Sequence, residues 1–345
     1  MGVITIVGAG MMGSAIGIPA AENNHQVRLV GTPLDREIIE YARKTGRHLT
    51  LERKLPNSYQ YYHIEQLKEA LLGADLLVSG VSSFGVEWFL ENVLPVIPDG
   101  LPVLSVTKGM QDTEAGELIP YPHLYQRRLG ERKISINAVG GPCTSYELAN
   151  HDQTLVCFCG EDLSTLREIK KYFQTSYYHI CLSTDVVGVE CAVAMKNAYA
   201  LAATLAVGLS ERIEGIGGKE HYNSQAALFG QSVREMRALL RLVGGKDENI
   251  VYGAGDLYVT VFGGRTRKIG TLLGRGLSFD DVMRQLDGVT LESIVIATRT
   301  ASAVRKLIDA GKARKEDYPL LLHVDEIINQ NAPVNIPWEK FEIET

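Results

Sequence analysis

The feature that most constrains the fold of this chain is a short apolar run that ends directly in spaced glycines. Residues Val3–Val7 are apolar or β-branched, as in a buried parallel strand, and Gly8, Gly10 and Gly13 follow at once. In a strand-to-helix turn, the first glycine permits the tight turn and the second lets a pyrophosphate approach the backbone. The third allows close packing of the helix, which should begin near Met12. The pattern predicts a dinucleotide site where helix N–H groups and the helix dipole favour phosphate.

A second strand pattern, residues 25–31, follows at the spacing of a βαβ unit and favours this interpretation over a purely structural glycine turn. An NAD-specific site would usually offer an acid where that strand ends. This chain instead has Gly31 and Thr32, with Asp35 and Arg36 slightly later. No arginine stands at the strand end to receive a 2'-phosphate, so both NAD and NADP remain open.

Strand and helix patterns then alternate through the first half of the chain. Strands are expected at 74–83, 103–106, from 133, at 152–160 and at 177–184, with helical patterns at 64–72 and 163–173. This alternation predicts a doubly wound, largely parallel sheet, a Rossmann-like α/β fold. Ser82 should lie at its carboxyl edge, near the ribose or diphosphate. Lys108 also ends a strand, either as a site residue, which we favour, or as a surface terminus.

Long helical patterns replace the strands after Asp185. They cover 188–209, 222–243, 279–286, 290–310 and 319–329. A chain of 345 residues exceeds what one core usually serves. We therefore expect a dinucleotide-binding domain at 1–185 and an all-helical substrate-binding and catalytic domain at 186–345.

The most unusual helical pattern, 188–209, is almost entirely apolar apart from Lys196 and Asn197. If it is helical, Lys196 lies on one strip with Ala192, Ala200 and Ala203, which leaves space for a ligand. A membrane span has the same length, but two polar residues near the middle favour a buried helix. A core helix whose lysine extends to water is the remaining alternative.

A glycine-rich stretch, residues 252–270, is the other candidate for a site. We expect Asp256 in a glycine-rich turn there, with Thr260 four residues later and Arg265 in a basic cluster. Backbone N–H groups and an arginine fork would suit a phosphate, and a solvated basic loop is the alternative.

Composition limits the class of protein. A formal net charge of -6 argues against a general nucleic-acid binder. Five cysteines without a CxxC pair suit free thiols in a reducing compartment, and the histidines lack metal-ligand spacing, so we expect no structural metal. The first residues show no cleavable apolar signal, so we expect the cytoplasm. We also expect no membrane span and a homodimer.

Taken together, the motifs resemble the NAD(P)-dependent glycerol-3-phosphate dehydrogenase family from Val3 to about Ile336. The matching segments, in order, are GAGMMGSA, VTKG, GGPCTSYELA, DVVGVECAVAMKNAYALAA, GDLYVT and GGRTRKIG. The resemblance implies reversible reduction of dihydroxyacetone phosphate to sn-glycerol 3-phosphate, which supplies the glycerophospholipid backbone.

The resemblance also implies residue roles. Lys196 falls on the catalytic lysine, Lys108 on a second active-site lysine and Asp256 on the acid that partners the catalytic lysine. Substrate contacts are expected from Asn197, Thr260, Arg265 and Thr266, with Arg265 gripping the phosphate. Cofactor contacts are expected from Gly8, Gly10, Met11, Met12, Gly13, Thr32, Ser82, Lys108, Arg265 and Glu292.

Some positions depart from the family pattern. Thr266 stands where asparagine is usual, Gln225 where lysine is usual, and Cys143 with Thr144 where a serine and an aromatic residue are usual. These changes bear on the exact substrate. The rival readings are a dehydrogenase of another phosphorylated polyol or a 3-hydroxy acid, and a nicotinamide-binding sensor without turnover.

Overall fold

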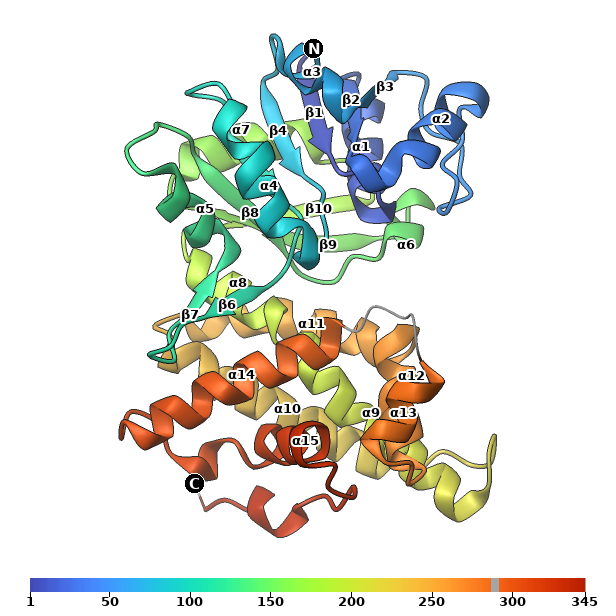
Figure 1. The fold of residues 1–345 in the computed structure, drawn as a ribbon, viewed down its shortest axis with the longest axis vertical. Coiled ribbons are helices and arrows are strands. Elements are labelled where there is room, and N and C mark those ends of the chain that lie inside the picture. The colour runs from blue at the N-terminus through green and yellow to red at the C-terminus, as the bar shows by residue number, and fades with distance from the viewer. Residues whose placement is uncertain (287–291, 345) are drawn as a thin grey trace. The chain divides into compact units, whose positions relative to one another are not determined.

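A computed structural model describes residues 1–286 and 292–344 (Figure 1). The chain forms two compact units. The sheet unit comprises Met1–Lys108 and Pro120–Glu190, and the helical unit comprises Gly109–Ile119 and Cys191–Thr345. The sequence prediction placed one boundary near residue 185, whereas here the chain leaves the sheet unit at Lys108, returns at Pro120 and leaves again after Glu190.

The sheet unit is built on one sheet whose strand order, among the described residues, is β10-β9-β8-β5-β4-β1-β2-β3. The strands are β1 Val3–Val7, β2 Gln26–Gly31, β3 Tyr59–His63, β4 Leu76–Ser79, β5 Val103–Ser105, β8 Ile136–Gly140, β9 Thr154–Gly160 and β10 Tyr178–Ser183. All neighbouring pairs run parallel except β8 with β9, where Ala138 lies opposite Cys159. The predicted Rossmann-like, largely parallel sheet is confirmed, with an antiparallel step near one end.

The strand order reverses at β1. Its neighbours are β2 on one side and β4 on the other, so the chain winds first toward β3 and then back toward β8. In open α/β sheets, ligands bind outside the carboxyl ends of the strands at such a reversal. This location is where the glycine turn after Val7 lies.

Helices flank the sheet because its strands are apolar on both faces, with Ile4, Ile6 and Val7 fully buried. The helices of this unit are α1 Met11–Glu22, α2 Arg36–Thr45, α3 Leu67–Leu71, α4 Val86–Asn92, α5 Tyr121–Leu129, α6 Ser145–Ala149 and α7 Leu163–Phe173. Separate apolar clusters form from strand residues that face in opposite directions, such as Ile6 and Val7.

The helical unit is built around α9, Lys196–Glu214, most of whose residues are buried. Around it lie α8 Val186–Ala194, which begins in the sheet unit, then α10 Tyr222–Leu242, α11 Ile250–Val261, α12 Gly264–Gly274, α13 Phe279–Gln285, α14 Glu292–Asp309 and α15 Pro319–Gln330. By length and composition Val186–Glu214 could cross a membrane, but 83% of its most apolar window is buried within the protein. It is a core segment.

A hairpin inserted from the first half of the chain completes the helical unit. Its strands are β6 Met110–Asp112 and β7 Leu118–Pro120. Lys306 Nζ on α14 donates to Thr113 O at 2.9 Å, and a side chain at Gly116 would approach Ala303 O to 3.1 Å. The hairpin therefore packs on α14. The sequence prediction did not include it.

Two other sequence predictions need correction. The predicted helix 188–209 is divided at Met195 into α8 and α9, so Lys196 begins a helix and does not lie in the middle of one. The stretch 252–270 is helical in α11 and α12, so Asp256 is not in a glycine-rich turn. The start of the predicted helix 290–310, at residues 290 and 291, lies outside the described residues.

Candidate functional site

In the turn after β1, backbone contacts leave no room for a side chain at Gly8 or Gly13. A Cβ at Gly8 would come within 2.6 Å of Gly80 C, and one at Gly13 within 2.2 Å of Gly8 O. A Cβ at Gly10 would meet nothing within 4 Å. Gly8, Gly13 and Gly80 therefore serve packing, whereas Gly10 leaves open space at the start of α1. Such space lets a pyrophosphate reach the N–H groups of a helix N-terminus.

Two side chains fix the residue between the first two glycines. Ala9 N donates to Asp35 Oδ2 at 3.0 Å, and Ala9 O lies 2.8 Å from His48 Nε2. Leu51 N donates to His48 Nδ1, so Nε2 carries the proton and donates to Ala9 O. Burial lowers the pKa of His48, which favours this neutral form. The glycine turn is thus rigid before any ligand binds.

Asp35 lies near the position where an NAD-specific site would have a ribose-binding acid, but its carboxylate stabilises the glycine turn. Its Oδ2 also accepts from Thr32 N at 2.9 Å and from Thr32 Oγ1 at 2.7 Å. Sequence reasoning noted Asp35 but not this task, and it missed His48 and Gly80. A glycine after the predicted β4 was the visible signal for Gly80, whereas nothing in the sequence singled out His48.

The other predicted cofactor residues of the sheet unit lie along the carboxyl ends of the strands. Met11 and Met12 form the first turn of α1, and Ser82 is exposed after β4. Lys108 follows β5 and is partly buried, with Nζ donating to Gly141 O at 2.8 Å. The open space at Gly10 and these polar ends fit a dinucleotide.

In the helical unit, Lys196 and Asp256 form a buried ion pair. Lys196 Nζ lies 2.6 Å from Asp256 Oδ1, and the side chains are 17% and 2% exposed. Lys196 occupies the first turn of α9, where the helix dipole disfavours a cation, so the carboxylate compensates. The two residues are 60 positions apart, and the structure brings them together.

Small residues let the helices that carry this pair come close. A Cβ at Gly253 on α11 would lie 2.4 Å from Ala192 O on α8. Asp256 follows Gly253 by about one helical turn, and Lys196 follows Ala192 by about one turn. The close approach at Gly253 therefore sets the spacing of the ion pair.

Glycines also hold α12 against α9. A Cβ at Gly208 would lie 2.0 Å from Thr271 O, and one at Gly270 would lie 2.1 Å from Thr204 Oγ1. These contacts pack the second half of α12, the helix that carries Arg265, against the middle of α9.

A cavity of about 230 Å³ is lined by residues that lie close in the chain to the ion pair and by the start of α12. It is lined by Asn197, Thr260, Gly263, Gly264, Arg265, Thr266, Glu292 and Ser293. Asn197 adjoins Lys196 in the chain, and Thr260 lies one turn after Asp256, with its hydroxyl donating to Asp256 O at 2.7 Å. The structure thus brings together all the substrate-binding residues that the sequence predicted, and Glu292 with them.

The cavity suits a small anion. Arg265 and Thr266 stand in the first turn of α12, whose N–H groups and dipole favour negative charge. Gly264 has φ +78°, a conformation that side chains rarely adopt, at the point where the chain enters this helix. A guanidinium and a helix N-terminus together are a recurrent means of binding phosphate.

Other polar residues are committed to structural contacts. Arg267 Nη2 lies 3.1 Å from Glu220 Oε1, and Gln225 Nε2 donates to Glu220 Oε2 at 3.1 Å. Thr144, another departure from the family pattern, accepts from Glu147 N at the start of α6. Gln225 and Thr144 thus have structural contacts of their own, while Thr266 is buried and lines the cavity.

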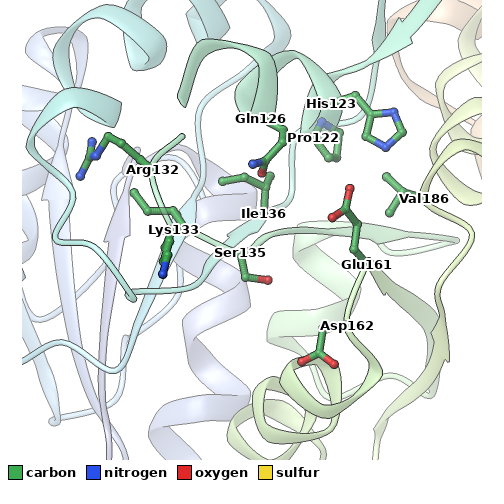
Figure 2. A pocket seen from close by; sticks show the side chains of 11 residues that line it. Pro122, His123, Gln126, Arg132, Lys133, Ser135, Ile136, Glu161, Asp162 and Val186 are labelled. Atoms are coloured by element: carbon green, nitrogen blue, oxygen red, sulfur yellow. The ribbon is translucent and has the colours of Figure 1, made fainter. Parts of the chain in front are cut away.

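A second cavity, of about 300 Å³, lies in the sheet unit (Figure 2). Its wall includes Pro122, His123 and Gln126 from α5, and Glu161 and Asp162 from the turn between β9 and α7. It also includes the start of β8, so it lies at the amino end of a parallel strand, away from the edge where dinucleotides bind. Asp162 already accepts from Ser164 N and Thr165 N as the cap of α7. We do not assign the predicted sites to it.

A parallel sheet with a glycine turn at its reversal point, joined to a helical unit with a buried lysine–aspartate pair, is the arrangement of a nicotinamide-dependent dehydrogenase. Residues 3–166 match the family model described as NAD-dependent glycerol-3-phosphate dehydrogenase N-terminus. Residues 185–339 match that described as the C-terminus of the same family. The chain belongs to the NAD-dependent glycerol-3-phosphate dehydrogenase family.

Relatives across the family support this assignment. The chain is 32% identical over 287 residues to the NADP(+)-dependent glycerol-3-phosphate dehydrogenase of Archaeoglobus fulgidus, covering 83% of this chain and 84% of the relative. It is 29% identical to the glycerol-3-phosphate dehydrogenase [NAD(P)+] of Koribacter versatilis, over 88% of each chain.

Solved structures agree on the fold. The glycerol-3-phosphate dehydrogenase of Coxiella burnetii superposes with a TM-score of 0.78 at 22% identity, covering 99% of this chain and 97% of that one. The Plasmodium falciparum enzyme gives a TM-score of 0.81 at 18% identity, covering 99% and 96%. The protein is an oxidoreductase that uses NAD or NADP, and the comparisons favour glycerol-3-phosphate dehydrogenase over the rival readings.

Proposed function

We propose that this chain interconverts dihydroxyacetone phosphate and sn-glycerol 3-phosphate, with Lys196 as the group that exchanges the proton. The observation that carries the proposal is the buried Lys196–Asp256 pair, whose chain neighbours Asn197 and Thr260 line an anion-suited cavity. Reduction of a ketone leaves negative charge on its oxygen, which needs a proton or a cation. Lys196 supplies either one.

The other residues have separate roles in this proposal. Gly10 and the N-terminus of α1 would hold the dinucleotide, whose nicotinamide would supply or receive the hydride at the middle carbon of the substrate. Arg265 and the N-terminus of α12 hold the phosphate, and Asn197 and Thr266 bind the substrate's polar groups. Lys108 is the second active-site lysine. Asp256 holds the Lys196 side chain in place through their ion pair.

Steady-state kinetics test the reaction. Dihydroxyacetone phosphate should be reduced with NADH or NADPH, whereas 3-keto acids and unphosphorylated dihydroxyacetone should be poor substrates. Both cofactors are needed in the assay, because Asp35 is committed to the glycine turn and cannot be assumed to select NAD. Equal turnover of a 3-keto acid would contradict the assigned substrate class.

Arg265→Ala tests the phosphate site. We expect the KM for dihydroxyacetone phosphate to rise by about 10- to 100-fold, since a hydrogen bond to a charged group contributes about 1.5–3 kcal/mol. Arg267→Ala is the matched control, because Arg267 pairs with Glu220 and does not line the cavity. An unchanged KM in Arg265→Ala, or the same rise in both variants, would place the phosphate elsewhere.

We further propose that the protein works as a homodimer in the cytoplasm, without a nucleic-acid partner. The net charge of -6 and the free cysteines support this setting. Light scattering of the purified protein would measure the subunit number.

A further inference from the structure

Glu190, which sequence reasoning passed over, is a buried acid without a hydrogen-bond partner. It lies on α8 and is 0% exposed. Neither Oε1 nor Oε2 is within hydrogen-bond reach of any group that the structure describes. Buried polar groups are nearly always paired, so an unpaired carboxyl calls for an explanation.

Glu235 shows how this protein treats a buried acid that serves the fold. Its carboxyl is also 0% exposed, but it accepts from Leu320 N at 2.7 Å, from Leu321 N at 2.9 Å and from Gln231 Nε2 at 2.8 Å. It thereby binds the N–H groups at the start of α15. Glu190 does no comparable work for a helix end.

The titratable groups that interact with Glu190 come from three elements of the sheet unit. Lys108 follows β5, Tyr125 lies on α5 and Cys159 lies on β9, and each interacts electrostatically with the Glu190 carboxyl. Burial raises the pKa of Glu190 to about 8, and the Lys108 ammonium opposes that rise. Burial also raises the pKa values of Tyr125 and Cys159, so neither ionises near neutral pH. Glu190 is then the group among them that changes charge there.

We propose that Glu190 is a positioning residue that acts through Lys108, neutral in the working enzyme and, once ionised, able to draw the Lys108 ammonium away from the substrate. With the proton in place, Lys108 keeps its bond to Gly141 O. When the proton leaves to solvent, the buried carboxylate has the nearby Lys108 as its counter-ion. This inference rests on the proposed role of Lys108 in catalysis.

The first test needs no catalysis. Urea unfolding of the wild type and Glu190→Gln is compared from pH 5 to 9. The folded protein keeps the Glu190 proton up to about pH 8, while the unfolded chain loses it near 4.5. Wild-type stability should therefore fall relative to Glu190→Gln as the pH rises through this window, and the difference should level off above it. A difference in stability that stays constant from pH 5 to 9 would show that the Glu190 carboxyl is not neutral in the folded protein.

The second test follows Lys108 itself. Acylation of Lys108 by acetic anhydride, measured by peptide mass spectrometry with exposed Lys133 as the internal reference, is compared at pH 7 and 9. In the wild type, ion pairing should protect Lys108 at pH 9, and Glu190→Gln should remove that protection at least about threefold. Equal protection in both proteins would show that Glu190 does not act on Lys108.

The third test is the pH profile of kcat/KM for dihydroxyacetone phosphate. The wild type should lose activity with an apparent pKa near 8, and Glu190→Gln should lack this step. In a Lys108→Ala background, Glu190→Gln should leave the profile unchanged. Cys159→Ala, the control, should retain the step. A step that persists in Glu190→Gln, or disappears in Cys159→Ala, would overturn the proposal.

These tests distinguish a failure of the proposed function from a failure of the proposed link between Glu190 and Lys108. If the wild type does not turn over any phosphorylated ketone, the proposed function fails, while unfolding and acylation still decide the link between Glu190 and Lys108. Suppose that turnover is normal, that Glu190→Gln lowers stability at every pH, and that it changes neither Lys108 acylation nor the pH profile of kcat/KM. Glu190 is then only a structural residue.

Discussion

Lys196 and Lys108 each lie near a buried acid, but the two lysine–acid pairs are held differently. In the helical unit, Lys196 Nζ and Asp256 Oδ1 are 2.6 Å apart, and the helices around them approach closely at Gly253. In the sheet unit, Lys108 donates to a backbone carbonyl, and Glu190 has no hydrogen-bond partner among the described residues. Lys196 and Asp256 therefore form an ion pair, whereas the Glu190 carboxyl accepts no hydrogen bond from the described residues.

The difference separates two uses of a buried charge. A close pair fixes the charge of its lysine and contributes to the fold, because removing either member leaves a buried charge uncompensated. An unpaired acid weakens the fold whenever it ionises, so its value must lie in function. Substitutions in the Lys196–Asp256 pair should therefore lower stability, whereas replacing Glu190 should raise stability at high pH.

The largest effect is expected for Lys196→Ala. Turnover should fall by about 100- to 10,000-fold with cofactor binding retained, since a positioned acid or base contributes about that much. The free energy of unfolding should also fall, by about 3–5 kcal/mol, because Asp256 is left buried without its lysine. Single-turnover kinetics and urea unfolding measure the two effects.

Lys108→Ala is the comparison for that result. Losing its bond to Gly141 O should cost about 0.5–1.5 kcal/mol of stability at pH 7, where Glu190 is neutral. Near-normal turnover in Lys196→Ala, or an equal loss of stability in both variants, would show that the two lysine–acid pairs do not differ in the way proposed.

A smaller effect is expected when the acid of the close pair is neutralised. Asp256→Asn keeps the shape of the side chain but removes its charge, and we expect a loss of about 1.5–3 kcal/mol, measured by urea unfolding at pH 8. Glu190→Gln, measured in the same way, should gain stability at that pH. If both variants lose stability alike, the two acids have the same role.

A further effect concerns the close approach of the helices that sets the spacing of the Lys196–Asp256 pair. Gly253→Ala places a methyl group 2.4 Å from Ala192 O, and the shift of α11 should cost about 1–3 kcal/mol and reduce turnover. Thermal unfolding and kcat measure both. Gly230→Ala, in α10, is the matched control, because nothing lies within 4 Å of its new methyl group. The control should gain about 0.5–1 kcal/mol, and a loss as large as that of Gly253→Ala would show that packing at 253 is not special.

The sheet was predictable from sequence because its central strands are continuous apolar runs that end in glycine or polar residues. Val3–Val7 and the strand after His25 fall where the pattern placed them. β3, with the sequence YQYYH, escaped because its residues are polar and aromatic at the sheet edge. Its place depends on pairing with β2, which is not a local property.

The helical part of the site was harder to predict because glycine occurs both in turns and where two helices pack closely. The glycines around Asp256 predicted a turn, yet Gly253 lies inside α11 and permits close packing. The pairing of Lys196 with Asp256 was inferred from family resemblance, and spacing alone could not have supplied it. Glu190 was missed because burial without a partner is visible only in three dimensions.

The hairpin of residues 109–119 affects how such a protein can evolve. It belongs to the helical unit but is encoded within the sheet unit, so neither unit corresponds to one uninterrupted stretch of gene. A single recombination event at the later junction would deliver the helices without the segment that packs on α14. The two halves are therefore expected to have been inherited together, and exchange between relatives should be confined to loops.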